Sequence, residues 1–172
     1  MEHVIITSGK YKGRKISTPG RNTHPMGSRE KLALFNMLTG KIEGATVLDA
    51  FAGSGALGIE ALSRGAAEVV FVERNSKACK IIKKNLESLG INEGARIIKS
   101  SVSETTGEYD VILADPPYDN FDLPEVESLT KLLKSGGILV LSHPEEAPKL
   151  DSLTLSKTHQ YAAAHLSIYF KD

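Results

Sequence analysis

A glycine-rich turn is the first part of the sequence whose residue types and spacing could serve chemistry. Gly53, Gly55 and Gly58 form the pattern Gly-x-Gly-x-x-Gly, after a segment typical of a buried strand and before one with helical periodicity. The first two glycines let the backbone turn tightly and approach a ligand, and the third lets the helix pack closely on the strand. The pattern predicts a turn that binds a nucleotide-like cofactor.

Two acidic residues near this turn restrict the kind of cofactor. Asp49 precedes the glycines, where its charge would repel the pyrophosphate of a dinucleotide. The same carboxylate suits the α-ammonium group of S-adenosylmethionine, and the sulfonium of that cofactor also favours an anionic pocket. Glu73 ends the next predicted strand, where a carboxylate can accept hydrogen bonds from both hydroxyls of a ribose. Together with the glycines, these acids predict an S-adenosylmethionine site.

A second group of residues, Asp115-Pro116-Pro117-Tyr118, follows a later predicted strand. The prolines stiffen the loop and remove two backbone donors, so that the loop presents mainly acceptors. Asp115 and the Pro116 carbonyl could accept hydrogen bonds from an exocyclic amine of a nucleobase and aim its lone pair at a methyl donor. Tyr118 supplies a ring on which the base can stack. The loop predicts methylation of an amino group.

The elements around these residues alternate between strand and helix patterns, which predicts an α/β fold with a mostly parallel sheet covered by helices on both faces. Carboxyl ends of parallel strands meet at one edge, where open α/β sheets bind their ligands. A final pair of alternating segments predicts an antiparallel hairpin. The expected strands are 46–51, 68–73, 95–99, 109–114 and 138–141, the helices 56–64, 76–89 and 123–133, and the hairpin strands 153–157 and 165–170.

The first forty residues differ from the rest in composition. They contain seven basic and two acidic residues, a net charge of +5, so the remaining chain carries −5. Glycine and proline interrupt this part, which has a strand-like stretch at 14–17 and a helical pattern from Ser28 to Gly40. We therefore expect a basic N-terminal arm with a helix over 1–40 and a cofactor-binding domain over 41–172.

Composition limits the remaining possibilities. A chain of 172 residues that is 41% hydrophobic can bury one substantial core. Its single cysteine, the absence of a signal-like segment and the lack of a long apolar run predict a cytoplasmic protein that does not cross a membrane. We expect a monomer, although no pattern in the sequence determines the oligomeric state. The five histidines show no metal-ligand spacing, so we expect no metal site.

The combination of motifs resembles class I amino-methyltransferases, which act on adenine N6, cytosine N4 or guanine N2. A closer likeness covers nearly the whole chain, which is similar to the small bacterial enzymes that make N2-methylguanine in small-subunit (16S) ribosomal RNA. This resemblance implies a Rossmann-like, seven-stranded class I methyltransferase fold, S-adenosylmethionine as methyl donor, and a partner that is ribosomal RNA or the small ribosomal subunit. The likeness is carried by the glycine turn, Asp115-Pro-Pro-Tyr118, and the segments 6–16, 23–38, 58–66 and 166–169.

The resemblance also assigns further residues to the two sites. It implies that Phe51 and Ser54 contact the cofactor, and that Ser101 and Val102 lie near its adenine, where the family often has Asp or Asn and backbone amides must serve instead. His24 and Ser28 also depart from the family pattern in the arm. The residues that the arm would use to hold RNA are Lys12, Arg14, Lys15, Arg21 and Arg29.

The main hypothesis is therefore a methyltransferase that acts on guanine N2 in 16S ribosomal RNA. An adenine-N6 methyltransferase on DNA or RNA remains open, because the Asp-Pro-Pro-Tyr loop suits any amine of that geometry, although no separate target-recognition domain is present for DNA. An NAD-binding module is opposed by Asp49 and leaves Asp115 without a role. A silent RNA-binding protein would differ by transferring no methyl group.

Overall fold

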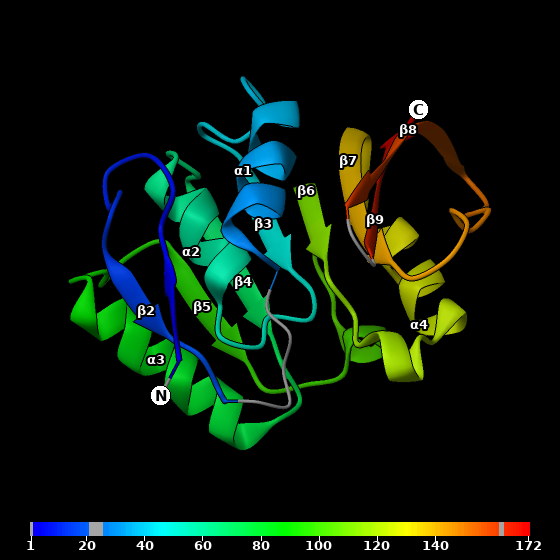
Figure 1. Cartoon of the computed structure of the whole chain (residues 1–172). Helices are drawn as coiled ribbons and strands as arrows, with labels where there is room; N and C mark the ends of the chain where they lie inside the picture. The colour runs from blue at the N-terminus through cyan, green and yellow to red at the C-terminus, as the bar shows by residue number, and fades with distance from the viewer. Residues whose placement is uncertain (1, 21–25, 162–163) are drawn as a thin grey trace.

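The central feature of the computed structural model, which describes residues 2–20, 26–161 and 164–172, is a seven-stranded sheet (Figure 1). Its strand order is β5-β4-β3-β6-β7-β9-β8, in which the first five strands are parallel and β9 is antiparallel to both neighbours. The α/β class, the mostly parallel sheet and the C-terminal hairpin predicted from the sequence are confirmed. The strands are β3 (Thr46–Asp49), β4 (Glu68–Val72), β5 (Ala95–Ile98), β6 (Tyr109–Ala114), β7 (Leu133–His143), β8 (Leu153–Tyr161) and β9 (Ala164–Lys171).

Both faces of the sheet are covered because its strands are apolar on both sides. In β6, Val111 and Leu113 join a core with three helices, whereas Ile112 and Ala114 join a second core on the opposite face. The short helix α4 (Leu123–Ser128) and the 3₁₀ turn η3 (Leu129–Leu132) pack into the second core. The helices of the first core are α1 (Ser28–Met37), α2 (Ala56–Ser63) and α3 (Ser76–Ser88).

The N-terminal residues form a two-stranded antiparallel sheet that was only half predicted. β1 (His3–Ile5) pairs with β2 (Lys15–Ser17), and Ile16 lies in the same apolar core as α1 and the large sheet. Only the second strand was expected from the sequence, although the β-branched run Val-Ile-Ile-Thr at 4–7 was an available signal for β1. The predicted arm therefore packs against the predicted domain through a shared core.

The predicted helix over 123–133 is wrong in length. α4 ends at Ser128, and η3 leads directly into β7, which begins at Leu133. The glycines that suggested a break lie inside β7: Gly136 has φ +74° at a shift in register between β6 and β7. A Cβ on Gly137 would lie 2.7 Å from the Lys134 carbonyl oxygen, so the bulge requires glycine there. Glycine in this segment marks a bulge and not a strand boundary.

A buried ion pair ties the N-terminal segment to α2. Glu60 is fully buried, and its carboxylate lies 3.1 Å from Lys31 Nζ and 3.2 Å from Arg64 Nε. Both the backbone N–H and the hydroxyl of Thr7 donate to it, as does the N–H of Ser8 at 3.1 Å. Burial alone would raise the pKa of Glu60, but the Thr7 hydrogen bonds and the Lys31 charge outweigh it and hold the pKa below its usual value. The segment before β2 is thus attached to the helix that follows the glycine turn.

Removing Lys31 should therefore destabilise the whole protein. We expect Lys31→Met to lower the free energy of unfolding by about 3–5 kcal/mol at pH 7, because the buried Glu60 charge then loses its fully buried cationic partner. Because folding lowers the Glu60 pKa, the contribution of the carboxylate is present above its unfolded pKa and is lost as pH falls. Urea denaturation measures both effects. The matched control is Lys83→Met, which breaks an exposed pair of 3.9 Å with Glu87 and should cost less than about 1 kcal/mol.

Candidate active site

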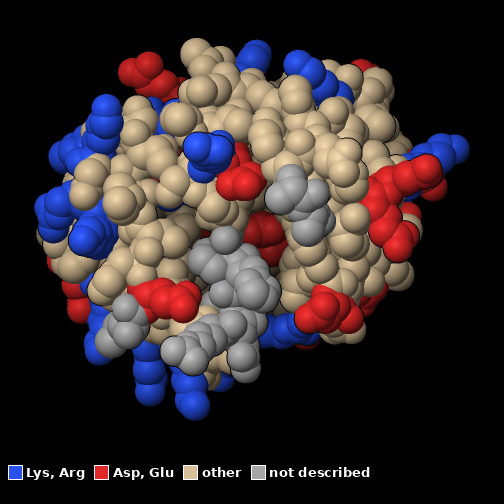
Figure 2. Space-filling view, in the orientation of Figure 1, with Lys and Arg blue, Asp and Glu red and all other residues tan. Residues whose placement is uncertain are grey.

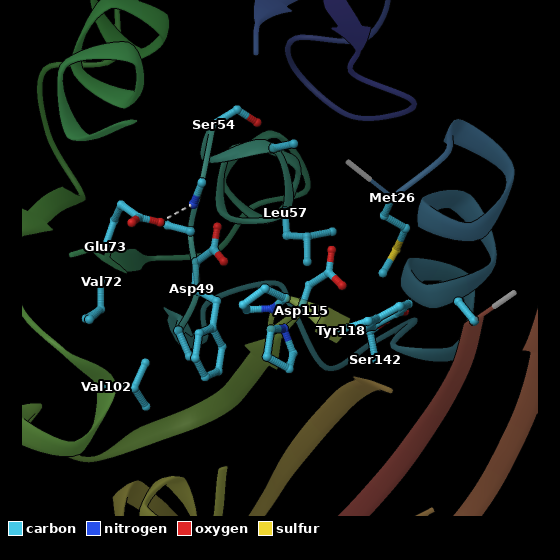
Figure 3. Close-up of a pocket in the computed structure, with 18 of the residues that line it drawn as sticks. Met26, Asp49, Ser54, Leu57, Val72, Glu73, Val102, Asp115, Tyr118 and Ser142 are labelled. Carbon is cyan, nitrogen blue, oxygen red and sulfur yellow. Dashed lines mark hydrogen bonds between the residues drawn. The ribbon is translucent and has the colours of Figure 1, made fainter. Parts of the chain in front are cut away.

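A cavity of about 720 Å³ opens at the carboxyl ends of β3, β4 and β6. Figure 3 shows Glu73, Asp49 and Asp115 spread across it, with Tyr118 and Ser142 beside Asp115. Because β3 lies between β4 and β6 in the sheet, the three carboxylates come from three adjacent strands. The structure thus brings together the two groups of residues that the sequence had placed at one sheet edge.

Asp49 ends β3 and is only 1% exposed. Burial raises the pKa of Asp49 to about 8; the hydrogen bond from the Gly58 N–H opposes this shift, and the charges of Asp115 and Glu73 add to it. That bond is 2.9 Å long and reaches Asp49 Oδ2. An anionic carboxylate here is stabilised by a cationic ligand, which is the chemistry expected for an ammonium or sulfonium group.

The glycine turn has the geometry that its sequence predicts. Gly53 and Gly55 have φ of +56° and +80°, values that side chains rarely adopt, and α2 begins directly after Gly55. A Cβ on Gly58 would lie 2.3 Å from a ring carbon of Phe71 on β4, so only glycine lets α2 approach the sheet this closely. Ser54 also lines the cavity.

Glu73 follows β4 and holds the turn from the neighbouring strand. Its Oε2 accepts the Gly53 N–H at 2.9 Å, and its Oε1 accepts the Asn75 N–H at 2.8 Å. Each carboxylate oxygen has a second lone pair. Glu73 can therefore accept further hydrogen bonds from a ligand, such as those of two adjacent hydroxyls, without leaving the loop.

The cavity has two halves, one next to Asp49, Glu73 and the glycine turn and the other next to Asp115. The first half is also lined by Phe51, Ser101 and Val102. Ser101 directs its hydroxyl to Glu104 at 3.0 Å and so contacts its own 3₁₀ turn, η1 (Val102–Glu104). The Val102 N–H, which the sequence had suggested for an adenine, donates at 3.3 Å to the carboxylate of Glu125 on α4. Glu125 also lines the cavity, but only the folded chain brings α4 next to η1, and its sequence position gave no signal.

The other half of the cavity contains Asp115, Pro116 and Tyr118. Burial raises the pKa of Asp115 to about 6, and a hydrogen bond from Ser142 opposes the shift. Pro116 is buried, whereas Tyr118 is half-buried at the start of the turn η2 (Tyr118–Asn120), and its hydroxyl bonds with that of Ser142. Sequence reasoning missed Ser142, since a serine near a strand end carries no distinctive pattern.

The four predicted RNA-binding residues that the structure describes lie outside the cavity. Lys12, Arg14, Lys15 and Arg29 are exposed, and Arg21 lies outside the described residues. Figure 2 shows basic side chains gathered along the left and lower edges, where Figure 1 places β2 and α3, and acidic side chains at the central hollow. The arm nevertheless reaches the cavity through uncharged Pro19, Met26 and Gly27, acidic Glu30, and Lys31, whose charge is paired with Glu60.

Asn85 on α3 connects the arm to the glycine turn, and sequence reasoning also missed it. Its Nδ2 donates to the carbonyl oxygens of Ser17 at 2.9 Å and Ser54 at 3.0 Å, and its Oδ1 accepts the Ser17 N–H at 2.9 Å. The side chain is buried. An asparagine on the inward face of an amphipathic helix, beside Ile82 and Leu86, was the available signal.

Comparisons with known proteins identify the family of this chain. The model of a family described as "Conserved hypothetical protein 95" matches residues 4–170. Ribosomal RNA small subunit methyltransferase D of Haemophilus influenzae is 38% identical over 71% of this chain and 67% of its own length. The protein of the same name from Buchnera aphidicola (strain Bp) is 31% identical over 96% of this chain and 91% of its own. The chain therefore belongs to the family described as "Conserved hypothetical protein 95".

A solved structure supports the family assignment along the full length of the chain. The Escherichia coli protein yhhF superposes with a TM-score of 0.88 at 29% identity and covers 99% of both chains. The resemblance stated from the sequence motifs is thereby confirmed. In the part of the chain that the structure describes, no three His, Cys, Asp or Glu residues could together hold a metal ion, and no helix is long and apolar enough to cross a membrane.

The raised pKa of Asp49 predicts how cofactor binding depends on pH. If the carboxylate binds an ammonium group, S-adenosylmethionine should bind more tightly as pH rises from 5.5 to 7, by up to about tenfold per unit, because ionising the buried acid costs progressively less. Asp49→Asn should weaken binding at pH 7 at least about tenfold and flatten this dependence. Calorimetry measures both. Equal affinity and equal pH dependence in the two proteins would remove Asp49 from the cofactor site.

Proposed function

We propose that this protein transfers a methyl group from S-adenosylmethionine to the exocyclic N2 amine of a guanine in small-subunit ribosomal RNA. The observation that carries the proposal is the arrangement of Asp49, Glu73 and Asp115 on adjacent strands around one cavity. Two relatives that cover most of this chain are named ribosomal RNA small subunit methyltransferase D, which supports ribosomal RNA as the substrate. Guanine N2 as the acceptor rests on the resemblance and on the chemistry of the loop after β6.

One half of the cavity fits the cofactor. S-adenosylmethionine supplies an electrophilic methyl group on a sulfonium. Glu73 would accept from the ribose hydroxyls, because its free lone pairs lie at the end of β4, and Asp49 would bind the α-ammonium group. The glycine turn lets the backbone come close to the ligand, and Phe51 and Val102 would pack against the adenine. The cluster of negative charge attracts a cation and favours release of the neutral product after transfer.

The other half of the cavity fits a planar base with an amino group. The Asp115 carboxylate and the Pro116 carbonyl would accept one hydrogen bond each from the amine, which orients its lone pair along the line of attack. Tyr118 would stack on the base, since its ring lines the cavity next to Asp115. Asp115 must be ionised to stabilise the positive charge that develops on nitrogen, and its pKa of about 6 allows this at neutral pH.

The exposed basic residues of the arm would hold the RNA outside the cavity. Acidic residues outnumber basic ones in the lining of the cavity: Glu30, Asp49, Glu73, Asp115, Asp119 and Glu125 face Arg74 and Lys31, and Lys31 is paired with Glu60. This excess of acidic groups disfavours the entry of phosphates and favours that of an uncharged base. A basic surface beside an acidic cavity therefore separates backbone binding from base binding. An enzyme that acts on a flipped-out base, or on an unstacked base in an RNA loop, requires this separation.

Two changes test the proposed acceptor: one removes the Asp115 carboxylate that would bind the amine, and the other removes the exocyclic amine of the target guanine. We expect Asp115→Ala to lower turnover about 100-fold or more while S-adenosylmethionine binds nearly as well, because the lost interaction acts mainly in the transition state. Ribosomal RNA in which the target guanine is replaced by inosine lacks the exocyclic amine and should accept no methyl group at that nucleotide. Transfer of labelled methyl is the measurement. Methylation of the inosine would move the acceptor to a ring atom or to the ribose.

The role of the arm is tested by neutralising Lys12, Lys15 and Arg29 to Gln together. Arg14 is left unchanged, because its guanidinium donates to the Ser88 carbonyl oxygen at 2.8 Å and supports the fold. We expect weaker RNA binding and a shallower dependence of log affinity on log salt, since fewer counterions are released. The matched control neutralises three exposed lysines outside the arm, Lys131, Lys149 and Lys157. An equal loss in the control would mean that only net charge matters.

A further inference from the structure

Ser142 connects the two parts of the proposed acceptor site. Its hydroxyl hydrogen-bonds with the Tyr118 hydroxyl, and the pairing of β6 with β7 places it beside Asp115, whose pKa it lowers as a hydrogen-bond donor. The residue is 2% exposed and lies near the end of β7, so it belongs to the rigid sheet. In contrast, Tyr118 lies in the short turn η2. Because both neighbours of this buried hydroxyl line the cavity, Ser142 can influence how each of them is placed.

The strand pairing explains why these three residues meet. Ala114 on β6 pairs with Leu141 on β7, so the next residues, Asp115 and Ser142, lie side by side at the sheet edge. A serine hydroxyl has one proton and two acceptor lone pairs. Ionised Asp115 can only accept, so when Ser142 gives its proton to Asp115, the Tyr118 hydroxyl is the donor to Ser142.

We propose that Ser142 is a positioning residue for methyl transfer, which holds the Asp115 carboxylate and the Tyr118 ring in the relative arrangement that receives the base. The inference rests on the proposed function. Through one hydroxyl anchored in the sheet, the group that binds the amine and the ring that stacks on the base are kept in register. Ser142 hydrogen-bonds with neither Asp49 nor Glu73 among the described residues, so it acts on the cofactor half only through the charge of Asp115, which raises the pKa of Asp49.

The hydrogen bond from Ser142 also affects the charge of Asp115. Burial raises the pKa of Asp115, and the Ser142 bond lowers it, because a donor stabilises the ionised carboxylate. Removing the hydroxyl therefore lets the pKa rise further. Since ionised Asp115 is the active form, loss of Ser142 shifts the onset of activity to higher pH, an effect that a purely structural serine would not have.

The test is Ser142→Ala, with kcat measured by single-turnover methyl transfer between pH 5 and 9. We expect kcat at pH 7 to fall about tenfold or more, the rise of kcat with pH to move to higher pH, and affinity for S-adenosylmethionine to stay within about twofold. Ser142→Thr keeps the hydroxyl and should keep the wild-type pH profile. Tyr118→Phe added to Ser142→Ala should cost less than Tyr118→Phe does alone, because the two groups share one hydrogen bond. A pH profile in Ser142→Ala that matches the wild type overturns the proposal.

Ser167→Ala is the matched control. Ser167 is a fully buried serine on the neighbouring strand β9, and its hydroxyl bonds with His143 Nε2 at 2.7 Å and with the Thr158 hydroxyl at 2.8 Å. Its loss should lower stability by a similar amount but leave the pH profile of kcat unchanged. An equal shift in this control would show that the effect is general and overturn the proposal.

A second measurement separates this inference from the proposed function. The ionisation of Asp115 can be followed by carbon NMR of labelled aspartate carboxyl groups, with Asp115→Asn to identify the signal. We expect the Asp115 pKa to be higher in Ser142→Ala than in the wild type, whether or not any RNA is methylated. If the pKa rises and no RNA is methylated, the proposed function fails while the hydrogen bond stands. An unchanged Asp115 pKa overturns the role of Ser142.

Discussion

The proposed chemistry of this protein depends on three carboxylates that converge at the ends of three adjacent parallel strands. Asp49, Glu73 and Asp115 lie around one cavity, and burial together with mutual repulsion raises the pKa of Asp49 to about 8. Such a cluster is unfavourable on its own and becomes favourable when a cation binds. The sheet topology produces the cluster, because β4, β3 and β6 are neighbours and end at the same edge. A cofactor that carries both an ammonium and a sulfonium group matches this constraint.

The glycine turn, which is proposed to bind the cofactor, is fixed by contacts from several elements. Asp49 and Glu73 bind its amides, Asn85 binds the Ser54 carbonyl oxygen, and Glu60 on the following helix binds the N-terminal segment. These contacts join the arm, α2 and α3 into one unit. As a result, the basic residues proposed to hold RNA and the acidic cavity proposed to receive the base have a fixed relation to each other, as accurate placement of a target amine requires.

Much of the fold and of the candidate site could be predicted from the sequence, because its local patterns are strong. The order of strands and helices, the glycine turn and the loop at Asp115 follow from periodicity and from residues that only certain backbone conformations accept. The positions that escaped prediction depend on long-range contacts. Ser142 matters through the pairing of β7 with β6, Glu125 through the approach of α4 to η1, and the glycines of β7 mark a bulge that only the pairing reveals. Side chains distant in sequence acquire their roles only when the sheet has formed.

The most direct test of the central claim is to identify the methylated nucleoside. Small-subunit ribosomal RNA from a strain that lacks this gene would be incubated with the purified protein and S-adenosylmethionine, then digested and analysed by mass spectrometry. A carboxylate-lined cavity that holds the amine of a guanine predicts the appearance of N2-methylguanosine, up to one per RNA molecule. Formation of N6-methyladenosine, of a ring-methylated or ribose-methylated nucleoside, or of no methylated product with either free RNA or the small ribosomal subunit would contradict this account.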